Sequence, residues 1–109
     1  MQANQAAGKA FEAKVAGQME AEGWTVGREV TVETASGVRT RIDIVGTKGC
    51  TIRCVECKSS ATAPLTTNQR AGFPEIGTGG ATVRGAGKPN VPGGTQIPPT
   101  QVEIVRPPQ

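Results

Sequence analysis

The chain has 109 residues, the size of one domain with a modest core, and only three aromatic residues. Twelve Lys and Arg against nine Asp and Glu give a net charge of +3, and the absence of His excludes His-based triads, His general bases and His metal ligands. No segment is apolar enough to span a bilayer and the first residues lack a signal-peptide pattern, so we expect a soluble domain.

The N-terminal half predicts one helix followed by three strands. Apolar side chains recur every fourth residue over residues 8–23, as on one face of a helix: Phe11, Val15 and Met19. Residues 24–33 alternate apolar and polar side chains, with a kink or bulge at Gly27, and residues 38–45 alternate again. After a turn, residues 50–58 carry apolar side chains on both faces, as expected inside a sheet.

The C-terminal half predicts a second helix, a long loop and a closing strand. Thr66 is suited to cap the start of a short helix, whose length Pro74 limits. Residues 77–99 hold eleven Gly or Pro and predict an irregular segment with at most one short strand, over residues 81–84. Residues 100–106 alternate and predict a strand that brings this loop back onto the sheet.

Two carboxylates and a lysine carry the predicted chemistry. Asp43 is the only Asp in the chain, and we expect it on the strand face opposite Ile42 and Ile44. Glu56 and Lys58 lie two residues apart on the next strand and therefore share a face. Carboxylates from two adjacent strands supply the oxygen ligands that Mg²⁺ prefers, and a nearby Lys can orient the attacking water or stabilise developing charge. The pattern predicts Mg²⁺-dependent hydrolysis of phosphodiester bonds, in which Mn²⁺ can replace Mg²⁺.

At this point the chain resembles the PD-(D/E)xK nuclease superfamily. That family has a mixed α/β core of helix, three-stranded antiparallel sheet, helix and further strand, with Asp on the second strand and Glu-x-Lys on the third. The resemblance implies a site of five residues: Glu12, Asp43, Glu56, Lys58 and Gln69. Within this set Asp43 and Glu56 are the implied metal ligands. The resemblance covers residues 8–76 of a single domain over residues 1–109, with Ile42 standing where the family often has Pro.

The hairpin between the second and third strands sets a geometrical requirement. If it is symmetric about the middle of a turn at residues 46–49, Asp43 lies opposite Ile52. Ile52 is four residues from Glu56, or roughly 13 Å along a strand at ~3.3 Å per residue, which is too far to share a metal. The nuclease hypothesis therefore requires an asymmetric turn, strong twist or a bulge.

Two segments, residues 54–72 and 93–99, look similar to restriction-endonuclease-fold toxin domains at the C-termini of bacterial polymorphic toxins. This resemblance implies delivery into a rival cell as part of a larger toxin, action in the target-cell cytoplasm on DNA in preference to RNA, and a cognate immunity protein. We expect that immunity protein to be acidic and to cover the basic rim of the site. A repair or restriction-type nuclease, an RNase toxin of the same fold and a non-catalytic nucleic-acid-binding module are the alternatives.

Several candidate residues have a second interpretation. Glu56 and Lys58 can instead form an ordinary surface ion pair, with Asp43 an unrelated carboxylate near a turn. Glu12 can pair on the helix surface with Lys9 or Lys14. Gln69 can close a capping box with Thr66, because Gln at the third helical position reaches back to the N-cap amide.

The cysteines and the strand arginines each leave two interpretations. Cys50, Cys54 and Cys57 suggest zinc, but a fourth ligand is missing and residues 54 and 57 fall on opposite strand faces, so we expect reduced cysteines in the core. Three arginines can contact phosphates or be merely solvated: Arg39, Arg41 and Arg53.

Overall fold

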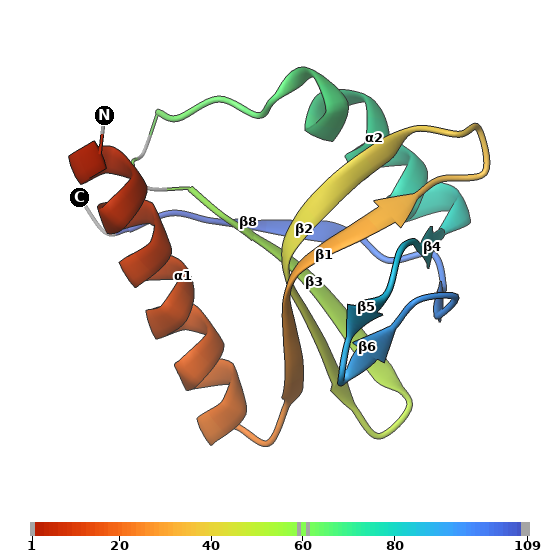
Figure 1. The fold of residues 1–109 in the computed structure, drawn as a ribbon, viewed down its shortest axis with the longest axis horizontal. Coiled ribbons are helices and arrows are strands. Elements are labelled where there is room, and N and C mark those ends of the chain that lie inside the picture. Colours follow the sequence, from red (N-terminus) through yellow and green to blue (C-terminus); the bar gives the residue numbers. More distant parts are fainter. Residues whose placement is uncertain (1, 59, 61, 108–109) are drawn as a thin grey trace.

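The computed structural model describes residues 2–58, 60 and 62–107, with side chains from residue 8 onward; residues 1, 59, 61, 108 and 109 of the predicted domain lie outside the described residues. The elements in chain order are α1 (Gln2–Ala21), β1 (Thr25–Glu33), β2 (Arg39–Lys48), β3 (Thr51–Cys57), α2 (Thr67–Gly79), β4 (Ala81–Val83), β5 (Gly87–Lys88), β6 (Val91–Pro92), β7 (Gln96–Ile97) and β8 (Val102–Val105). The predicted order of helix, three strands, helix and later strand is confirmed (Figure 1). In the described part of the chain, neither helix is long and apolar enough to cross a membrane.

A mostly antiparallel sheet separates the two helices. Its six strands run in the order β7-β4-β1-β2-β3-β8, and β8 is parallel to β3. One aliphatic cluster lies under α2 and includes Phe73 and Ile76, whereas the other lies under α1 and includes Val15 and Met19. The predicted α/β class is therefore confirmed, and strand β3 lies inside the sheet as expected.

The register of the β2–β3 hairpin corrects the predicted turn. Strand β2 continues to Lys48, which pairs with Thr51, so the turn consists of Gly49 and Cys50. Gly49 has a φ of 61°, as the first central residue of a type II′ turn requires. The pairs Ile44↔Val55 and Val45↔Cys54 continue this register, so position 43 faces position 56. The hairpin is symmetric about a later centre, and neither a bulge nor an asymmetric turn is needed.

The predicted faces of β2 are wrong at one point. Ile42 and Ile44 were expected on one face, but Ile42 packs in the cluster under α2 and Ile44 in the cluster under α1. Val45 belongs to the same cluster as Ile42, so the alternation shifts by one residue at Asp43. Asp43 therefore lies where the buried face of the strand changes sides, and its side chain is only half-buried.

The facing strand β1 makes the same shift at Glu29. Val26 packs under α1, whereas Val30 packs under α2, although both positions have the same parity. Glu29 between them has a φ of 57°, the left-handed region that side chains other than Gly rarely adopt. The pairs on either side, Arg28↔Ile44 and Val30↔Ile42, keep one register, because both strands shift together. The predicted irregularity of β1 is thus at Glu29 and not at Gly27.

Helix α2 is longer than predicted. Thr66 is its N-cap as expected, but Pro74 lies inside the helix, which continues to Gly79. The Pro74 ring is exposed, and the next turn is retained because Phe73 and Ile76 on the opposite side are buried in the core.

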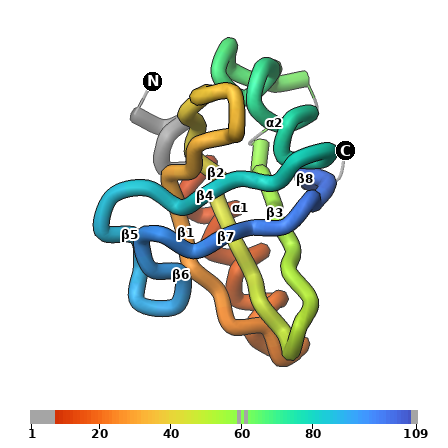
Figure 2. Tube along the Cα trace, turned by 90° about the vertical axis from the view of Figure 1, so that its right-hand side faces the viewer, coloured from red at the N-terminus to blue at the C-terminus, as the bar shows by residue number. Residues whose placement is uncertain are grey.

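The glycine-rich segment contains more strand than predicted. The short strand β4 is confirmed, and two-residue strands β5, β6 and β7 follow it. β4 pairs with β1 and with β7, and Figure 2 shows β4 and β7 side by side, crossing the direction of β2 and β3. Val91 and Ile97 anchor the segment in the core, so the loop returns onto the sheet as expected.

The left-handed conformation of Glu29 yields a stability prediction. Both Glu29→Gly and Glu29→Ala remove the side chain, but only Gly removes the Cβ clash that opposes a positive φ. We expect Glu29→Gly to be more stable than Glu29→Ala by about 1 kcal/mol in urea denaturation, the reverse of the usual order within a strand. A more stable Ala variant would show that residue 29 does not hold this conformation in solution.

Candidate active site

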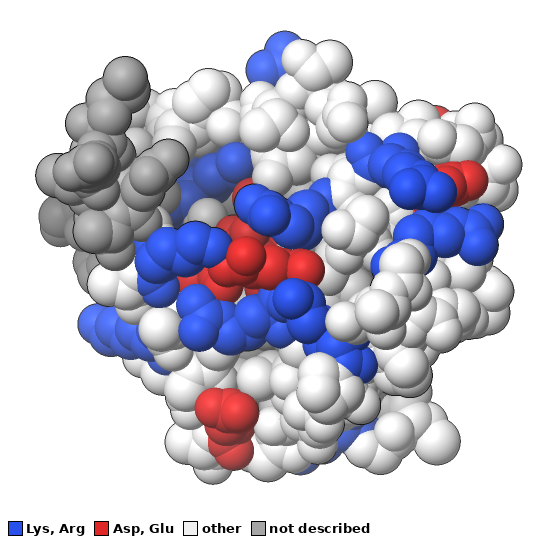
Figure 3. Space-filling view, viewed as in Figure 1, with Lys and Arg blue, Asp and Glu red and all other residues white. Residues whose placement is uncertain are grey.

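One open cavity of about 1160 Å³ collects all five residues of the predicted site. The side chains come from three regions of the fold, namely α1 (Glu12), the facing strands β2 and β3 (Asp43, Glu56 and the adjoining Lys58) and the first turn of α2 (Gln69). Figure 3 shows acidic side chains at the centre of this face with Lys and Arg side chains around them. The chain fold thus builds an acidic floor inside a basic rim.

Asp43 and Glu56 are held close together by the hairpin register. The backbone N–H of Cys57 donates to Asp43 Oδ2 at 2.9 Å, which ties the Asp43 carboxylate to the strand that carries Glu56. Burial is the main cause that raises the pKa of both carboxyl groups, and the negative charge of Asp43 raises that of Glu56 further, to about 7. A buried carboxyl group whose ionisation is opposed by a neighbouring carboxylate is well placed to bind a cation together with that neighbour.

Glu56 is buried and only half satisfied. Its Oε2 accepts from Gln69 Nε2 at 2.7 Å and lies 3.3 Å from Lys58 Nζ. Its Oε1 is fully buried and has no hydrogen-bond partner. A buried carboxylate oxygen without a partner is costly, so this oxygen is free for a ligand that the protein itself does not supply.

Gln69 fulfils both roles that its position suggested. Its Oε1 accepts from the Thr66 backbone N–H at 2.9 Å, and Thr66 Oγ1 accepts from the Gln69 N–H at 3.1 Å, which completes the capping box. The same Oε1 also accepts from Lys58 Nζ at 2.8 Å, while the amide nitrogen donates to Glu56. The two interpretations are therefore not exclusive, because the cap fixes the amide that orients Lys58 and Glu56.

Glu12 lies inside the site and not on the helix surface. It is 4% exposed, and its Oε2 accepts from Arg28 Nε at 2.8 Å, so the expected alternative of surface pairs with Lys9 or Lys14 is wrong. Burial raises the pKa of Glu12, and the hydrogen bond from Arg28 opposes this shift. The nearby charge of Asp43 raises the pKa of Glu12 further, which places the two carboxylates within electrostatic reach of each other.

The donor set fits a hard divalent cation. In the part of the chain that the structure describes, no group of three or more His, Cys, Asp or Glu side chains is arranged to hold a metal ion. Mg²⁺ does not need one, because it usually binds one or two carboxylates and completes its shell with water and substrate phosphate oxygens. Asp43 and Glu56 match this requirement, and the unpartnered Glu56 Oε1 is the observation that supports the fit.

Comparison with protein families agrees with this site. A family model described as archaeal Holliday junction resolvase (Hjc) matches residues 3–71, which is more than half of the chain. The chain belongs to the archaeal Holliday junction resolvase family. This is a PD-(D/E)xK nuclease family, so the resemblance to that superfamily is confirmed. Comparisons with curated proteins and with solved structures find no significant match.

The segment that matches the Hjc family contains all five residues of the predicted site. The match favours the repair-type nuclease, which was the alternative, over the toxin. The polymorphic-toxin subtype, the immunity protein and delivery into a rival cell stay predictions.

The strand arginines differ in their relation to the site. Arg39 and Arg41 line the cavity, whereas Arg53 pairs with Glu103 on β8 and lies over the Trp24 ring. Arg39 and Arg41 are therefore placed to contact phosphates at the site, whereas Arg53 is not.

The sequence did not predict three charged residues in or beside the site: Lys9, which lines the cavity, and Arg28 and Glu29, which contact residues that line it. Arg28 holds Glu12, while Glu29 pairs with Lys9 and lies 4.0 Å from Arg41. Strand alternation alone predicts neither contact, because the alternation shifts at Glu29. The charged Arg28-Glu29 pair in the middle of an apolar strand was the available signal.

The cysteines are reduced and do not form a metal site. Cys54 packs under α2 and Cys57 under α1, on opposite faces of β3 as predicted. Cys50 is exposed in the hairpin turn, so only two of the three are core cysteines.

The buried Glu56 predicts a pH dependence of stability without metal. Its pKa rises from 4.5 to about 7 on folding, so the folded protein keeps a proton that the unfolded chain loses in this window. The contribution of Glu56 to the free energy of unfolding is therefore largest below pH 4.5. We expect the free energy of unfolding to fall by up to about 3 kcal/mol as the pH rises through 7. Urea denaturation in EDTA at pH 5 and pH 8 measures this loss.

Glu56→Gln is the control for that measurement, because an amide does not titrate. The variant should show a flatter pH profile and exceed the wild type in stability at pH 8. Equal slopes for the two proteins would contradict the assignment of the proton to Glu56.

The double role of Gln69 predicts unequal costs for two cap substitutions. Thr66→Ala removes one bond of the capping box and should cost about 1 kcal/mol. Gln69→Ala also leaves Glu56 and Lys58 without their partner, which should add about 1–3 kcal/mol in urea denaturation. Equal costs would mean that Gln69 acts only as a cap.

Proposed function

We propose that the chain is a Mg²⁺-dependent DNA endonuclease that cuts branched DNA, as the name of its family implies. The observation that carries the proposal is the pair of facing carboxylates, Asp43 and Glu56, with one buried oxygen free at the floor of a cavity with a basic rim. A phosphodiester brings the negative charge that this rim attracts. The floor supplies the oxygen ligands that a divalent cation needs.

Each side chain of the site has a distinct role in this proposal. Asp43 and Glu56 hold the divalent cation, which when bound lowers the pKa of a coordinated water and withdraws charge from the phosphate. Lys58, held by Gln69, orients the attacking water or stabilises the charge that develops on the phosphate. Glu12 assists from α1, where Arg28 fixes its carboxylate.

The rim supports binding to DNA through its backbone. Lys9, Arg39 and Arg41 line the cavity and carry charges that suit phosphate oxygens. Contacts to phosphates set the position of a nucleic acid without reading its sequence. We therefore expect the protein to select its DNA substrate by shape and not by base sequence.

The proposal predicts metal-dependent cutting that depends on the central residues. A labelled four-way junction, a linear duplex of the same sequence and an RNA strand are incubated with the protein in Mg²⁺, Mn²⁺ or EDTA. We expect cutting of the junction in Mg²⁺, and a loss of at least about 100-fold in Asp43→Asn, Glu56→Gln and Lys58→Met.

Glu103→Gln is the matched control, because it also removes one ion-paired carboxylate but lies outside the cavity, beside Arg53. Cutting that persists in EDTA, or equal cutting by Glu56→Gln and Glu103→Gln, would refute the proposal. Preferential cutting of the RNA strand would identify RNA, and not DNA, as the substrate. A folded wild type that binds DNA without cutting it would favour a binding module.

A further inference from the structure

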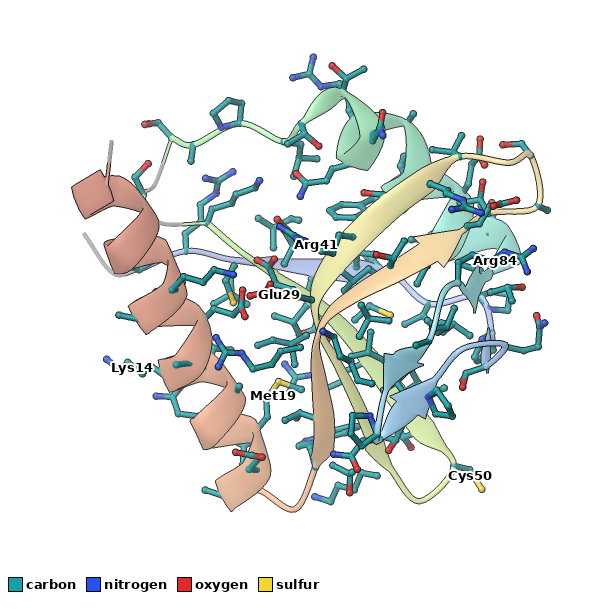
Figure 4. The ribbon with its side chains drawn as sticks, in the orientation of Figure 1. Lys14, Met19, Glu29, Arg41, Cys50 and Arg84 are labelled. Carbon is teal, nitrogen blue, oxygen red and sulfur yellow. The ribbon has the colours of Figure 1, made fainter. Side chains whose placement is uncertain are left out.

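The Glu29 carboxylate lies between two cations of the rim. It forms ion pairs with Lys9 of α1 and, at 4.0 Å, with Arg41 of β2. Figure 4 shows Glu29 and Arg41 close together on the face where the site opens. Lys9 and Arg41 line the cavity and are 57% and 62% exposed, whereas Glu29 is 27% exposed. One carboxylate thus pairs with cavity-lining cations from two different elements, α1 and β2.

The ion pairs alone do not account for a glutamate at position 29 of β1. Ion pairs between exposed side chains contribute little to stability, and Glu29 adopts a positive φ that disfavours any residue with a Cβ. Backbone strain of this kind concentrates at functional sites. The strained residue also faces the position of Asp43, at the point where both strands shift their buried face.

The two cations beside Glu29 are side chains that also bind phosphates. Lys and Arg bind carboxylate and phosphate oxygens with the same donors, so a carboxylate can take the place of a phosphate between them. Glu29 also places a negative charge near Asp43 and Glu12, where it raises the pKa of both. A polyanion that approaches the metal ligands therefore meets two cations whose charge Glu29 already offsets in part.

We propose that Lys9 and Arg41 form a phosphate-binding subsite beside the catalytic carboxylates, and that Glu29 occupies this subsite until a DNA phosphate replaces it. The inference rests on the proposed nuclease function for the identity of the polyanion. In the exchange no covalent bond changes: the Glu29 carboxylate leaves the two cations and a phosphodiester oxygen takes its place. Glu29 thus lowers the affinity of the subsite for DNA, because a phosphate must first displace its carboxylate.

Binding of a fluorescent DNA duplex, measured by anisotropy in EDTA over a series of salt concentrations, tests the subsite without catalysis. Glu29→Gln keeps the shape of the side chain but removes its charge. We expect it to bind DNA at least about threefold more tightly than Glu103→Gln, which changes the net charge equally but frees an arginine outside the cavity. The slope of log K against log salt should change little, because the same phosphate contacts Lys9 and Arg41 in the wild type once Glu29 has left them.

The cations supply the second half of the test. Lys9→Gln combined with Arg41→Gln should weaken binding and abolish the gain from Glu29→Gln. If Glu29→Gln does not fold, as judged by circular dichroism, Glu29→Asn replaces it, because Asn tolerates a positive φ.

Binding by Glu29→Gln that equals or falls below that of Glu103→Gln would overturn the subsite, as would a gain that persists without Lys9 and Arg41. The Mg²⁺ cleavage assay decides the nuclease function separately. A wild type that cuts DNA while Glu29→Gln gains no affinity would therefore refute the subsite alone.

Discussion

The candidate active site depends on the register of the β2–β3 hairpin. A two-residue turn at Gly49-Cys50 pairs Lys48 with Thr51, and this pairing carries through the hairpin to place Asp43 opposite Glu56. A shift by one residue would move every side chain of one strand to the other face and separate the two carboxylates. The Asp43 contact with the Cys57 backbone N–H fixes the same arrangement at the site itself. The positive φ of Gly49 in the turn is thus linked to the geometry of the site at the other end of the hairpin.

The electrostatics of the site follow from burial of like charges. Burial raises the pKa of Glu12, Asp43 and Glu56, and the charge of Asp43 raises the pKa of the two glutamates further. Arg28, Lys58 and Gln69 offset only part of this cost. The remaining cost is visible as the unpartnered Glu56 Oε1. Binding of a divalent cation would offset this cost. The burial of like charges that destabilises the metal-free site at neutral pH therefore favours metal binding.

Much of this arrangement could be predicted from the sequence, because it rests on periodicity and spacing. The helical spacing of Phe11, Val15 and Met19 and the Asp43, Glu56 and Lys58 motif predicted the core elements and a common site. The turn was misplaced because Gly46 and Gly49 are equally good turn residues in a local pattern. The face shift at Glu29 and Asp43 could not be seen, since it depends on one backbone angle that only the packed sheet imposes. The charged Arg28-Glu29 pair within an apolar strand marks Arg28 as unusual, but its pairing with Glu12 is a long-range contact that the local pattern does not predict.

The most direct test of the central claim is a crystal structure of the protein with Mn²⁺, in which anomalous scattering locates the metal. We expect a peak within bonding distance of an Asp43 oxygen and of Glu56 Oε1, and its loss in crystals of Asp43→Asn. A protein that binds no Mn²⁺ at these two carboxylates, or binds it elsewhere with both of them uncoordinated, would contradict the account.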